Sequence, residues 1–341
     1  MNDPHKGLSR HKNSSFFQDN DRRIDTLKIK CMCDPIKDYL TNKILKCILS
    51  KRGEKFGEYL DRYVILTNEY LHIYTDKLHT DYRGSYQLEF ITTEFFNDEV
   101  SNNRLGIKFK YNKYAEDLLT KDKIVYNNLR KELRKLTIQV DLTTRYEIIE
   151  KIGEGNFGSV YKAENKETGE KVALKKYNAG ELEKESNYFQ KQCIMQEITM
   201  LKNVQQTYLL QGDELKIDNL INMYEVHEIS NSIVLVMNLV EGGEFFDVVK
   251  NRDQFSWGES TTIMRQCLQG LAHLADINIA HRDIKPENLL FKYKDKPVIE
   301  NQIVICDFGM ATKCIMDKKL LLEKCGSPGY IAPEILEDGQ S

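Results

Sequence analysis

The sequence predicts an α+β fold, with a strand-rich segment followed by a second segment that mixes strands and long helices. The chain has 341 residues, which is longer than one domain usually is, so we expect two domains. Between about residues 38 and 112, aromatic and β-branched residues alternate with polar ones, as in half-buried strands. From Tyr146 onward, strand patterns give way to two stretches with apolar residues at helical spacing.

Composition excludes several classes of protein. Hydrophobic residues make up 41% of the chain, which is enough for ordinary cores, and the 49 basic residues nearly cancel the 52 acidic ones. Net charge therefore gives no reason to expect nucleic acid as a partner. No apolar run is long enough to span a bilayer, and the first residues lack the apolar core of a signal peptide. The eight cysteines are scattered, so we expect reduced thiols and a cytoplasmic protein.

The first domain is expected over residues 35–138, after a polar leader (1–34) that we expect to be disordered. Its strand-like runs include KCILSKRG and EYLDRYVILTNEYLHIY, and a hairpin turn is predicted at residues 67–69. A closing helix is predicted in KDKIVYNNLRKELRKL. Its apolar positions are Ile124, Leu129, Leu133 and Leu136. The helix also carries six basic and two acidic residues, which we expect to form a solvated outer face.

This small barrel or sandwich, closed by one amphipathic helix, resembles a pleckstrin-homology domain. The family's usual Trp in the last helix is absent, and Tyr126 is expected in its place. The resemblance implies a site for a phosphoinositide or an anionic membrane surface, with the protein peripheral at membranes, although Asp61 departs from the pattern. Docking onto the next domain, or inhibition of it, is the alternative. The basic candidates are Lys46, Lys51, Arg52, Lys55 and Arg62.

The second domain starts at Tyr146, so the boundary is expected within residues 130–145. Three strand-like runs come first, followed by a helix around KESNYFQKQCIMQEITMLKNV and two more strands. A further helix is predicted at 259–275, with an apolar stripe, and Trp257 is expected to pack against it. The stripe consists of Ile263, Cys267, Leu271 and Leu274.

A glycine triplet, Gly153, Gly155 and Gly158, lies between the first two of these strands. Such a triplet alone fits a dinucleotide fingerprint or a flexible turn. A dinucleotide site requires a helix next, so that its N-terminus holds the pyrophosphate. Here SVYKAEN reads as a strand, which favours a β-hairpin lid whose backbone N–H groups cover phosphates.

Lys175 follows in the apolar strand VALK. A buried ammonium without a partner is expensive, so a phosphate or a carboxylate is expected beside it. Glu197, on the following helix, is the carboxylate that we expect. The alternative is that both residues simply lie on the surface.

Three further motifs follow in order: HRDIKPENLL at 281–290, Asp307-Phe308-Gly309, and Ala332-Pro333-Glu334. With the glycine triplet and Lys175 they form the signature set of protein kinases. From Tyr146 to its end, the chain resembles a eukaryotic-type protein kinase. EGGEFFD, HRDIKPENLL and CGSPGYIAPE are most similar to the calcium/calmodulin-dependent group of Ser/Thr kinases. The resemblance implies a two-lobe kinase fold over 146–341.

The resemblance also implies ATP and Mg²⁺ as cofactors and a protein as substrate. The implied catalytic residues are Asp283, Lys285, Lys175 and Glu197, and the implied metal ligands are Asn288 and Asp307. Asp283 would accept the proton of the substrate hydroxyl, and Lys285 favours Ser/Thr over Tyr substrates. The implied nucleotide-binding residues are Ile152, Gly153, Gly155, Gly158, Val160, Ala173, Lys175, Met237, Asn238, Val240, Glu244, Glu287 and Leu290.

Two acidic residues suggest the substrate class. Glu244 and Glu287 match positions at which related kinases receive arginines upstream of the phosphorylated residue, so a basic substrate is favoured. The alternative is that Glu244 meets only the ribose of ATP and Glu287 only solvent.

The stretch 313–326 contains no Ser, Thr or Tyr. Kinases commonly use a phosphate here to pair with the Arg before the catalytic Asp, here Arg282. Asp317 or Glu323 is expected to replace it. Ser327 is expected to bond to Asp283 and Lys285.

The resemblance further implies that the C-terminal lobe is incomplete, because the helix that supports Glu334 in the family has no counterpart before residue 341. Two functions therefore stay open. One is an active Ser/Thr kinase. The other is a non-catalytic lipid- or protein-binding module that carries a kinase fragment.

Overall fold

The computed structural model describes most of the chain in eight ranges. These are residues 43–52, 58–98, 103–111, 114–155, 158–182, 187–210, 218–314 and 325–336. The expected leader (1–34) lies outside them. Among the described helices, none is both long and apolar enough to cross a membrane.

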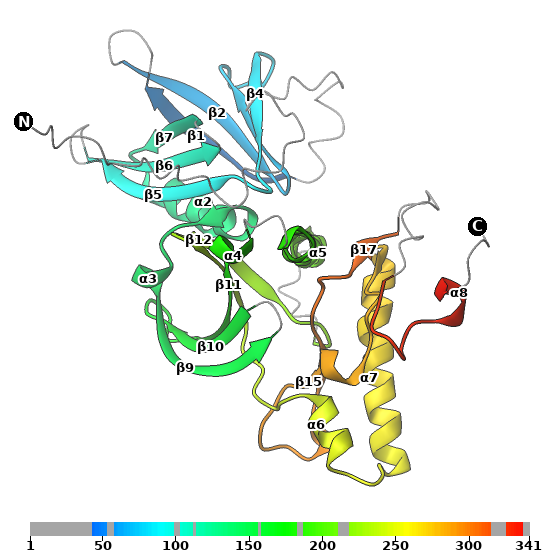
Figure 1. The fold of residues 1–341 in the computed structure, drawn as a ribbon. Coiled ribbons are helices and arrows are strands. Elements are labelled where there is room, and N and C mark those ends of the chain that lie inside the picture. Colours follow the sequence, from blue (N-terminus) through cyan, green and yellow to red (C-terminus); the bar gives the residue numbers. More distant parts are fainter. Residues whose placement is uncertain are drawn as a thin grey trace, which may run out of the picture.

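Seven antiparallel strands form the first part of the structure (Figure 1). They are β1 (Lys43–Arg52), β2 (Tyr59–Thr67), β3 (Tyr70–Tyr74), β4 (Tyr82–Gln87), β5 (Thr92–Asp98), β6 (Arg104–Tyr111) and β7 (Tyr114–Thr120). Their spatial order is β4-β3-β2-β1-β7-β6-β5. Alternating burial along β6, with Ile107 and Phe109 almost fully covered, turns one face of this sheet toward a core shared with the next helix.

Helix α2 (Lys123–Leu136) covers that core. It begins after Asp122, whose carboxylate accepts the N–H of Ile124 at 2.8 Å and so satisfies an otherwise unpaired helix terminus. Leu129 and Leu133 are fully buried against the strands. Ile124, in contrast, is 73% exposed, so its assignment to the apolar stripe was wrong.

The place expected for an aromatic residue in this helix is taken by Tyr126. Its ring is buried and meets the ring of Phe95 edge-on, with centroids 6.1 Å apart. Burial raises the pKa of the Tyr126 hydroxyl, as expected when an ionised phenolate would be poorly solvated.

The basic side chains of α2 form the expected solvated face only in part, because Lys123 and Lys131 are exposed whereas Arg130 is half-buried and Arg134 is buried. Arg134 is 5% exposed and pairs with Asp141 and, at 3.6 Å, with Glu225 of the second domain. Arg130 pairs with Glu167 at 3.2 Å, also in the second domain. This part of α2 therefore faces the neighbouring domain, because the carboxylates that neutralise it lie there.

The two parts share one sheet. Strand β8 (Ile138–Gln139) pairs in parallel with both β5 and β12 (Met223–Ile229), and it joins all thirteen strands into one order. A short helix, α3 (Leu142–Arg145), then leads into the second domain.

Five strands and a long helix make the first lobe of the second domain. The strands are β9 (Tyr146–Gly155), β10 (Gly158–Asn165), β11 (Lys171–Asn178), β12 and β13 (Ser232–Asn238), in the order β12-β13-β11-β10-β9. Helices α4 (Ala179–Leu182) and α5 (Tyr188–Leu210) lie between β11 and β12 in the chain. In Figure 1, α5 runs beside α4 and β12 on one side and β17 (Thr312–Lys313) on the other.

The second lobe contains two α-helices, α6 (Phe245–Lys250) and α7 (Trp257–Asp276), and a short helix, α8 (Pro333–Leu336), at its edge. Its short strands are β14 (Ile279–Ala280), β15 (Leu289–Phe291), β16 (Ile303–Ile305) and β17, and its 3-10 helices are η2 (Pro286–Asn288) and η3 (Val298–Glu300). A capping box between Ser256 and Glu259 starts α7. Ile263 and Cys267 are buried as predicted, but Trp257 is 87% exposed and does not pack as expected.

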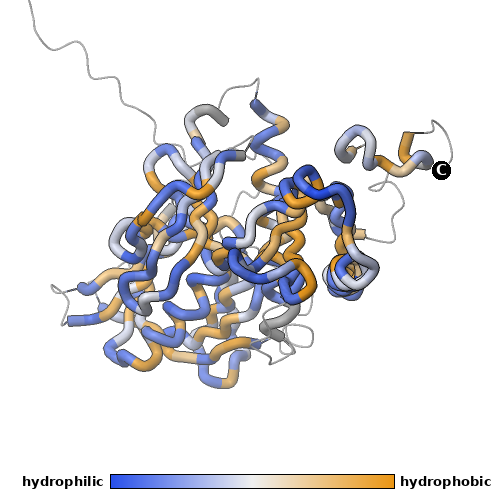
Figure 2. The backbone as a smooth tube through the Cα atoms, turned by 90° about the horizontal axis from the view of Figure 1, so that it is seen from below, coloured by the Kyte–Doolittle hydropathy of each residue, from blue (hydrophilic) through white to orange (hydrophobic). Residues whose placement is uncertain are grey.

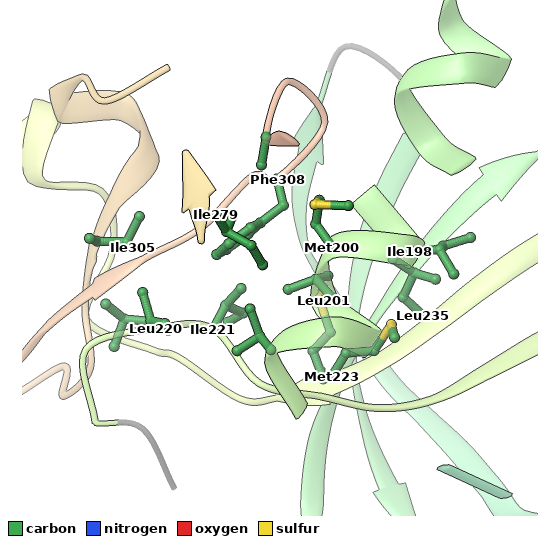
Figure 3. Packing of buried hydrophobic residues seen from close by; sticks show 14 of the residues in the cluster. Ile198, Met200, Leu201, Leu220, Ile221, Met223, Leu235, Ile279, Ile305 and Phe308 are labelled. Atoms are coloured by element: carbon green, nitrogen blue, oxygen red, sulfur yellow. The ribbon is translucent and has the colours of Figure 1, made fainter. Parts of the chain in front are cut away.

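One apolar core runs through both lobes. It joins α5 residues such as Leu201 to Met223 of β12 and to Phe308, which follows β16 (Figure 3). Apolar and polar stretches alternate along the chain in Figure 2, as expected when each strand and helix turns one side inward. Because this core holds α5 and the segment around Phe308 together, it positions the polar groups described below.

We predict that Leu133→Ala destabilises the first domain by about 2–5 kcal/mol, because it removes a fully buried side chain and leaves a cavity. Ile124→Ala is the matched control on the same helix and should change stability by about 0.5 kcal/mol or less. Urea unfolding monitored by circular dichroism measures both. Equal losses in the two variants would show that α2 packs with a different face inward.

Candidate active site

The glycine triplet forms the hairpin β9–β10. Gly155 pairs with Gly158, and Gly153 lies opposite Val160. A Cβ on Gly158 would lie 2.2 Å from the Lys176 carbonyl oxygen, so only glycine lets β10 approach β11 this closely. Residues 156–157, at the tip, lie outside the described residues. The glycine triplet is followed by strand β10, as predicted for a lid over phosphates.

Lys175 and Glu197 are brought together from β11 and α5. The Lys175 ammonium donates to Glu197 Oε1 at 2.7 Å, and the Glu197 side chain is 5% exposed. The Tyr177 hydroxyl donates to the second Glu197 oxygen. Burial lowers the pKa of Lys175, but Glu197, Tyr177 and Asp307 outweigh it and hold that pKa well above its usual range. The lysine is therefore a fixed positive charge.

Sequence reasoning missed Tyr177. Its signal was available, because residues two apart on a strand share a face, and Tyr177 follows Lys175 by two positions on β11. Tyr177 donates to the Glu197 oxygen that Lys175 does not reach, and this oxygen would otherwise be buried without a hydrogen bond.

The apolar residues expected around a nucleotide base come from several strands. Ala173 of β11 lies opposite Met237 of β13, which is 7% exposed, and Val160 lies opposite Lys175 on the neighbouring strand. Ile152, on β9, is 43% exposed. Val240 is partly buried and packs against the core that runs through both lobes.

The segment after β13 links the two lobes. Asn238 donates its N–H to the Asn222 carbonyl at 3.0 Å, and its side-chain oxygen accepts the Asn222 N–H at 2.7 Å. The backbone N–H and the side-chain oxygen of Asn238 are therefore already occupied. Further on, the Gly242 N–H donates to the Phe291 carbonyl at 2.8 Å, and a Cβ on Gly242 would lie 2.3 Å from that same oxygen.

Leu290 belongs to β15 in the second lobe, and a β-bridge joins it to Glu244. The Glu244 carboxylate is near two other acidic groups. Burial, followed by the charges of Asp247 and Glu287, raises its pKa above the ordinary value. Glu287 Oε2 is buried without a hydrogen-bond partner among the described residues. This acidic cluster of Glu244, Asp247 and Glu287 is suited to a cationic ligand.

The loop 281–290 gathers polar groups around Asp283. The Asn288 amide donates to Asp283 Oδ2 at 3.0 Å, and Lys285 pairs with the same oxygen at 2.9 Å. Asp283 Oδ1 accepts the Ser327 N–H at 3.0 Å, and Lys285 also donates to the Ser327 hydroxyl at 2.6 Å. The contacts expected of Ser327 are confirmed.

These contacts determine the charge of Asp283. Burial raises the pKa of this carboxyl, but hydrogen bonds from Lys285 and Ser327 and the Lys285 charge outweigh burial, so the net shift is downward. Asp283 is therefore ionised at neutral pH and can accept a hydrogen bond from a hydroxyl.

Asp307 follows β16 and is held by the backbone around it. Its φ is +64°, and that of Arg282 is +65°, a left-handed conformation that non-glycine residues adopt at a cost. Phe308 is fully buried beside His281, with ring centroids 5.0 Å apart. The Arg282 Nε donates to the Met310 carbonyl at 2.7 Å, which ties the loop to the segment after Asp307.

The loop and Asp307 are linked through main-chain contacts. The Cys306 N–H donates to the Asn288 carbonyl at 2.9 Å, and His281 Nε2 donates to the Cys306 carbonyl at 3.1 Å. Burial lowers the pKa of His281, so the ring is neutral. Burial raises the pKa of the Cys306 thiol to about 12, and this side chain therefore stays protonated.

The residues fit the Mg²⁺ that the family resemblance implies. Asn288 uses its amide N–H groups on Asp283, which leaves its side-chain oxygen as the remaining ligand atom. With the Asp307 carboxylate it supplies the hard oxygen atoms that Mg²⁺ prefers. No cluster of three or more His, Cys, Asp or Glu that could hold a metal occurs in the described ranges, and Mg²⁺ beside phosphates needs only one or two protein ligands.

Two expected features lie outside the described part of the chain or are undetermined. Asp317 and Glu323, expected to pair with Arg282, fall within the undescribed residues 315–324. The side chain of Glu334 is likewise not described.

A comparison with known families matches residues 146–341 to the model described as the protein kinase domain. The matched range begins at Tyr146, so the pleckstrin-homology likeness of the preceding residues stays a prediction.

Individual relatives give the same picture. Over 191 residues, 56% of this chain and 58% of the relative, the sequence is 35% identical to myosin light chain kinase A from Dictyostelium discoideum. It is 36% identical over 198 residues, 58% of this chain and 32% of the relative, to calcium-dependent protein kinase 5 from Plasmodium berghei. It is 32% identical over 197 residues, 58% of this chain and 51% of the relative, to calcium/calmodulin-dependent protein kinase type 1B from Rattus norvegicus. The chain thus spans less than two thirds of each of these relatives.

Proposed function

The chain belongs to the protein kinase domain family, and on that premise we propose that it transfers the γ-phosphate of ATP to serine or threonine hydroxyls of a protein. The observation that carries this proposal is that two polar pairs, one from each lobe, meet at Asp307. The pair of Lys175 and Glu197 lies in the first lobe, and the Asp307 charge acts on Lys175. The pair of Asp283 and Asn288 lies in the second lobe, and the Asn288 carbonyl accepts the N–H of Cys306, the residue before Asp307.

Phosphoryl transfer leaves little covalent work for the protein, so charge placement does most of it. In the proposed role, Lys175 holds the α- and β-phosphates, and Glu197 keeps the ammonium in place. The glycine hairpin β9–β10 would cover the phosphates with its backbone N–H groups. Support comes from the raised pKa of Lys175, which keeps this residue charged.

Asp283 is proposed to orient the substrate hydroxyl and accept its proton. Its lowered pKa keeps it ionised near neutral pH. Lys285, already beside Asp283, would stabilise the charge of the transferring phosphoryl group. Mg²⁺, held by Asn288 and Asp307, would neutralise the phosphates. The name of a relative from Danio rerio supports a Ser/Thr kinase, because that protein is described as a serine/threonine-protein kinase.

A basic substrate is the proposed preference. Glu244 and Glu287 lie close enough for the charge of one to raise the pKa of the other, and an arginine between them would relieve that repulsion. Arginine suits this role because its guanidinium binds carboxylates in a bidentate way.

We predict that Asp283→Asn lowers transfer to a basic peptide by about 10²–10⁴-fold, because it removes a proton acceptor. Transfer is measured with radiolabelled ATP and Mg²⁺, and nucleotide binding with a fluorescent ATP analogue. Binding should persist in the variant. Asp276→Asn, at the exposed end of α7, is the matched control and should keep full activity. No transfer by the unsubstituted chain, with intact nucleotide binding, would support the non-catalytic module instead.

We predict a pH dependence for the basic-substrate preference. Glu244 binds an arginine only when ionised, so the KM for an arginine-containing peptide should rise as pH falls through the pKa of this carboxyl. Because that pKa is raised, the rise should begin at a higher pH than for an ordinary glutamate. Glu244→Gln should raise KM about 10-fold at neutral pH, the equivalent of one charged hydrogen bond.

The control is a peptide with alanine in place of the upstream arginine. Its KM should be the same for both enzymes at every pH. If Glu244→Gln alters the KM for ATP and leaves the peptide KM unchanged, then Glu244 serves the ribose.

For residues 43–136 we propose a pleckstrin-homology domain that binds a phosphoinositide headgroup. The antiparallel order of β1–β7 followed by α2 supports this. A pocket of about 310 Å³ also brings together Lys51, Arg62 and Arg83 from three strands. Lys51 is paired there with Glu116, so a phosphate would have to compete with that carboxylate.

We predict that the double variant Arg62→Gln/Arg83→Gln weakens binding to vesicles containing phosphatidylinositol bisphosphate by roughly 10- to 30-fold, from about 1 kcal/mol per basic residue. Lys77→Gln, on the nearby β3–β4 turn, is the control. Cosedimentation measures binding. Equal binding to phosphatidylserine vesicles would mean a general anionic surface in place of a headgroup site.

A further inference from the structure

Helix α5 makes polar contacts on two opposite sides. Glu197 meets Lys175 on one side. At about 100° per residue, Thr199 and Lys202 lie on roughly the opposite side of the helix. The groups that they contact belong to the first domain, so one helix connects the two domains.

The contacts on the far side are specific. The Thr199 hydroxyl donates to Glu89 Oε1 at 3.0 Å. The Lys202 ammonium donates to the Glu89 carbonyl at 2.6 Å and to the Leu136 carbonyl, at the end of α2, at 3.2 Å. The same ammonium lies 5.8 Å from the centre of the Phe90 ring, within the range of a cation–π contact. We call residues 88–91 and Leu136 the bracket.

Lys202 favours one position of α5 relative to the bracket. The residue is 3% exposed, and burial lowers its pKa to about 8, so it still carries a proton at neutral pH. Two backbone carbonyls take the place of water around this charge. A shift of α5 away from the bracket would remove them, and a buried charge without partners is expensive.

The bracket is itself joined to the second domain by hydrogen bonds and an ion pair. The Ile138 N–H donates to the Ile91 carbonyl at 2.9 Å, and β8 pairs with both β5 and β12. Arg134 of α2 is tied to Glu225 of β12 at 3.6 Å. The bracket is therefore tied directly to the sheet that contains β12, against which α5 packs.

α5 also reaches the segment after Asp307. The Gln196 amide donates to the Ala311 carbonyl at 2.7 Å. A displacement of the helix would thus disturb both Glu197 and the backbone near Asp307.

We propose that the bracket of the first domain holds α5 where Glu197 meets Lys175, which makes Thr199 and Lys202 positioning residues for phosphoryl transfer. The inference rests on the proposed kinase activity. It means that the first domain supports the catalytic arrangement directly, through one helix, whatever this domain binds on its outer surface.

The test uses the full chain with substitutions at Lys202 and Thr199 and one control substitution. Lys202→Met keeps the aliphatic part of the side chain and removes the charge. Thr199→Val removes the hydroxyl at nearly constant volume, and Thr199→Ser restores it. Gln192→Met, at an exposed position of the same helix, is the matched control for Lys202→Met.

Two readouts are combined. Hydrogen–deuterium exchange of the α5 backbone reports the position of the helix without reference to activity. Steady-state kinetics with Mg·ATP and a basic peptide separate kcat from the peptide KM. We expect faster exchange around Glu197 in Lys202→Met and a kcat about 10-fold lower, equivalent to about 1.4 kcal/mol, with the peptide KM unchanged. Thr199→Val should show a smaller effect in the same direction, and Thr199→Ser should recover the parent values.

The outcomes separate the two proposals. Faster exchange in a chain that never transfers phosphate supports the bracket and overturns the kinase proposal. An active chain whose kcat and exchange are unchanged in both Lys202→Met and Thr199→Val overturns the bracket. If Lys202→Met fails to fold, the Thr199→Val and Thr199→Ser pair decides.

Discussion

The rest of the catalytic arrangement depends on how the carboxylate of Glu197 is neutralised. This group is buried, and an unpaired carboxylate in that position would be costly. Lys175 and Tyr177 occupy one oxygen each. Both come from the same face of β11, so the pairing determines where α5 can lie against the sheet. The position of α5 in turn determines the packing of the core that continues into the second lobe.

The same helix has a second set of polar contacts, on its far side. Lys202 is buried among carbonyls of the first domain, and β8 makes the sheet continuous across the boundary. The first domain therefore packs against the first lobe through α5 and extends its sheet. This arrangement explains why Arg134 of α2 finds its carboxylate partner Glu225 in the second domain.

In the second lobe, hydrogen bonds hold strained backbone in place. Arg282 and Asp307 both have positive φ, and buried neighbours such as Phe308 stabilise these conformations. The contacts of Asn288 with Asp283 and with the residue before Asp307 join the two strained segments. The strain thus occurs at Asp307, which is proposed to bind the metal, and at Arg282, directly before the proposed proton acceptor Asp283. A fixed geometry at these positions lowers the cost of ordering during the reaction.

The sequence by itself determined the elements and the order of the motifs. Period, glycine placement and a lysine in an apolar strand are local signals, and they were enough to predict the hairpin lid and the pairing of Lys175 with Glu197. The polar loop 281–290 was predicted from its motif and from the resemblance that the motif carries. Tertiary structure alone decided which partners distant charges find. Arg134 was expected on a solvated face, and no local signal marked Lys202, but folding placed carboxylates beside the first and carbonyls beside the second. Trp257 was expected to pack, although it is 87% exposed in the described chain. Local periodicity records which side of an element is apolar, whereas the partner of a charge is set by chain segments far away in sequence.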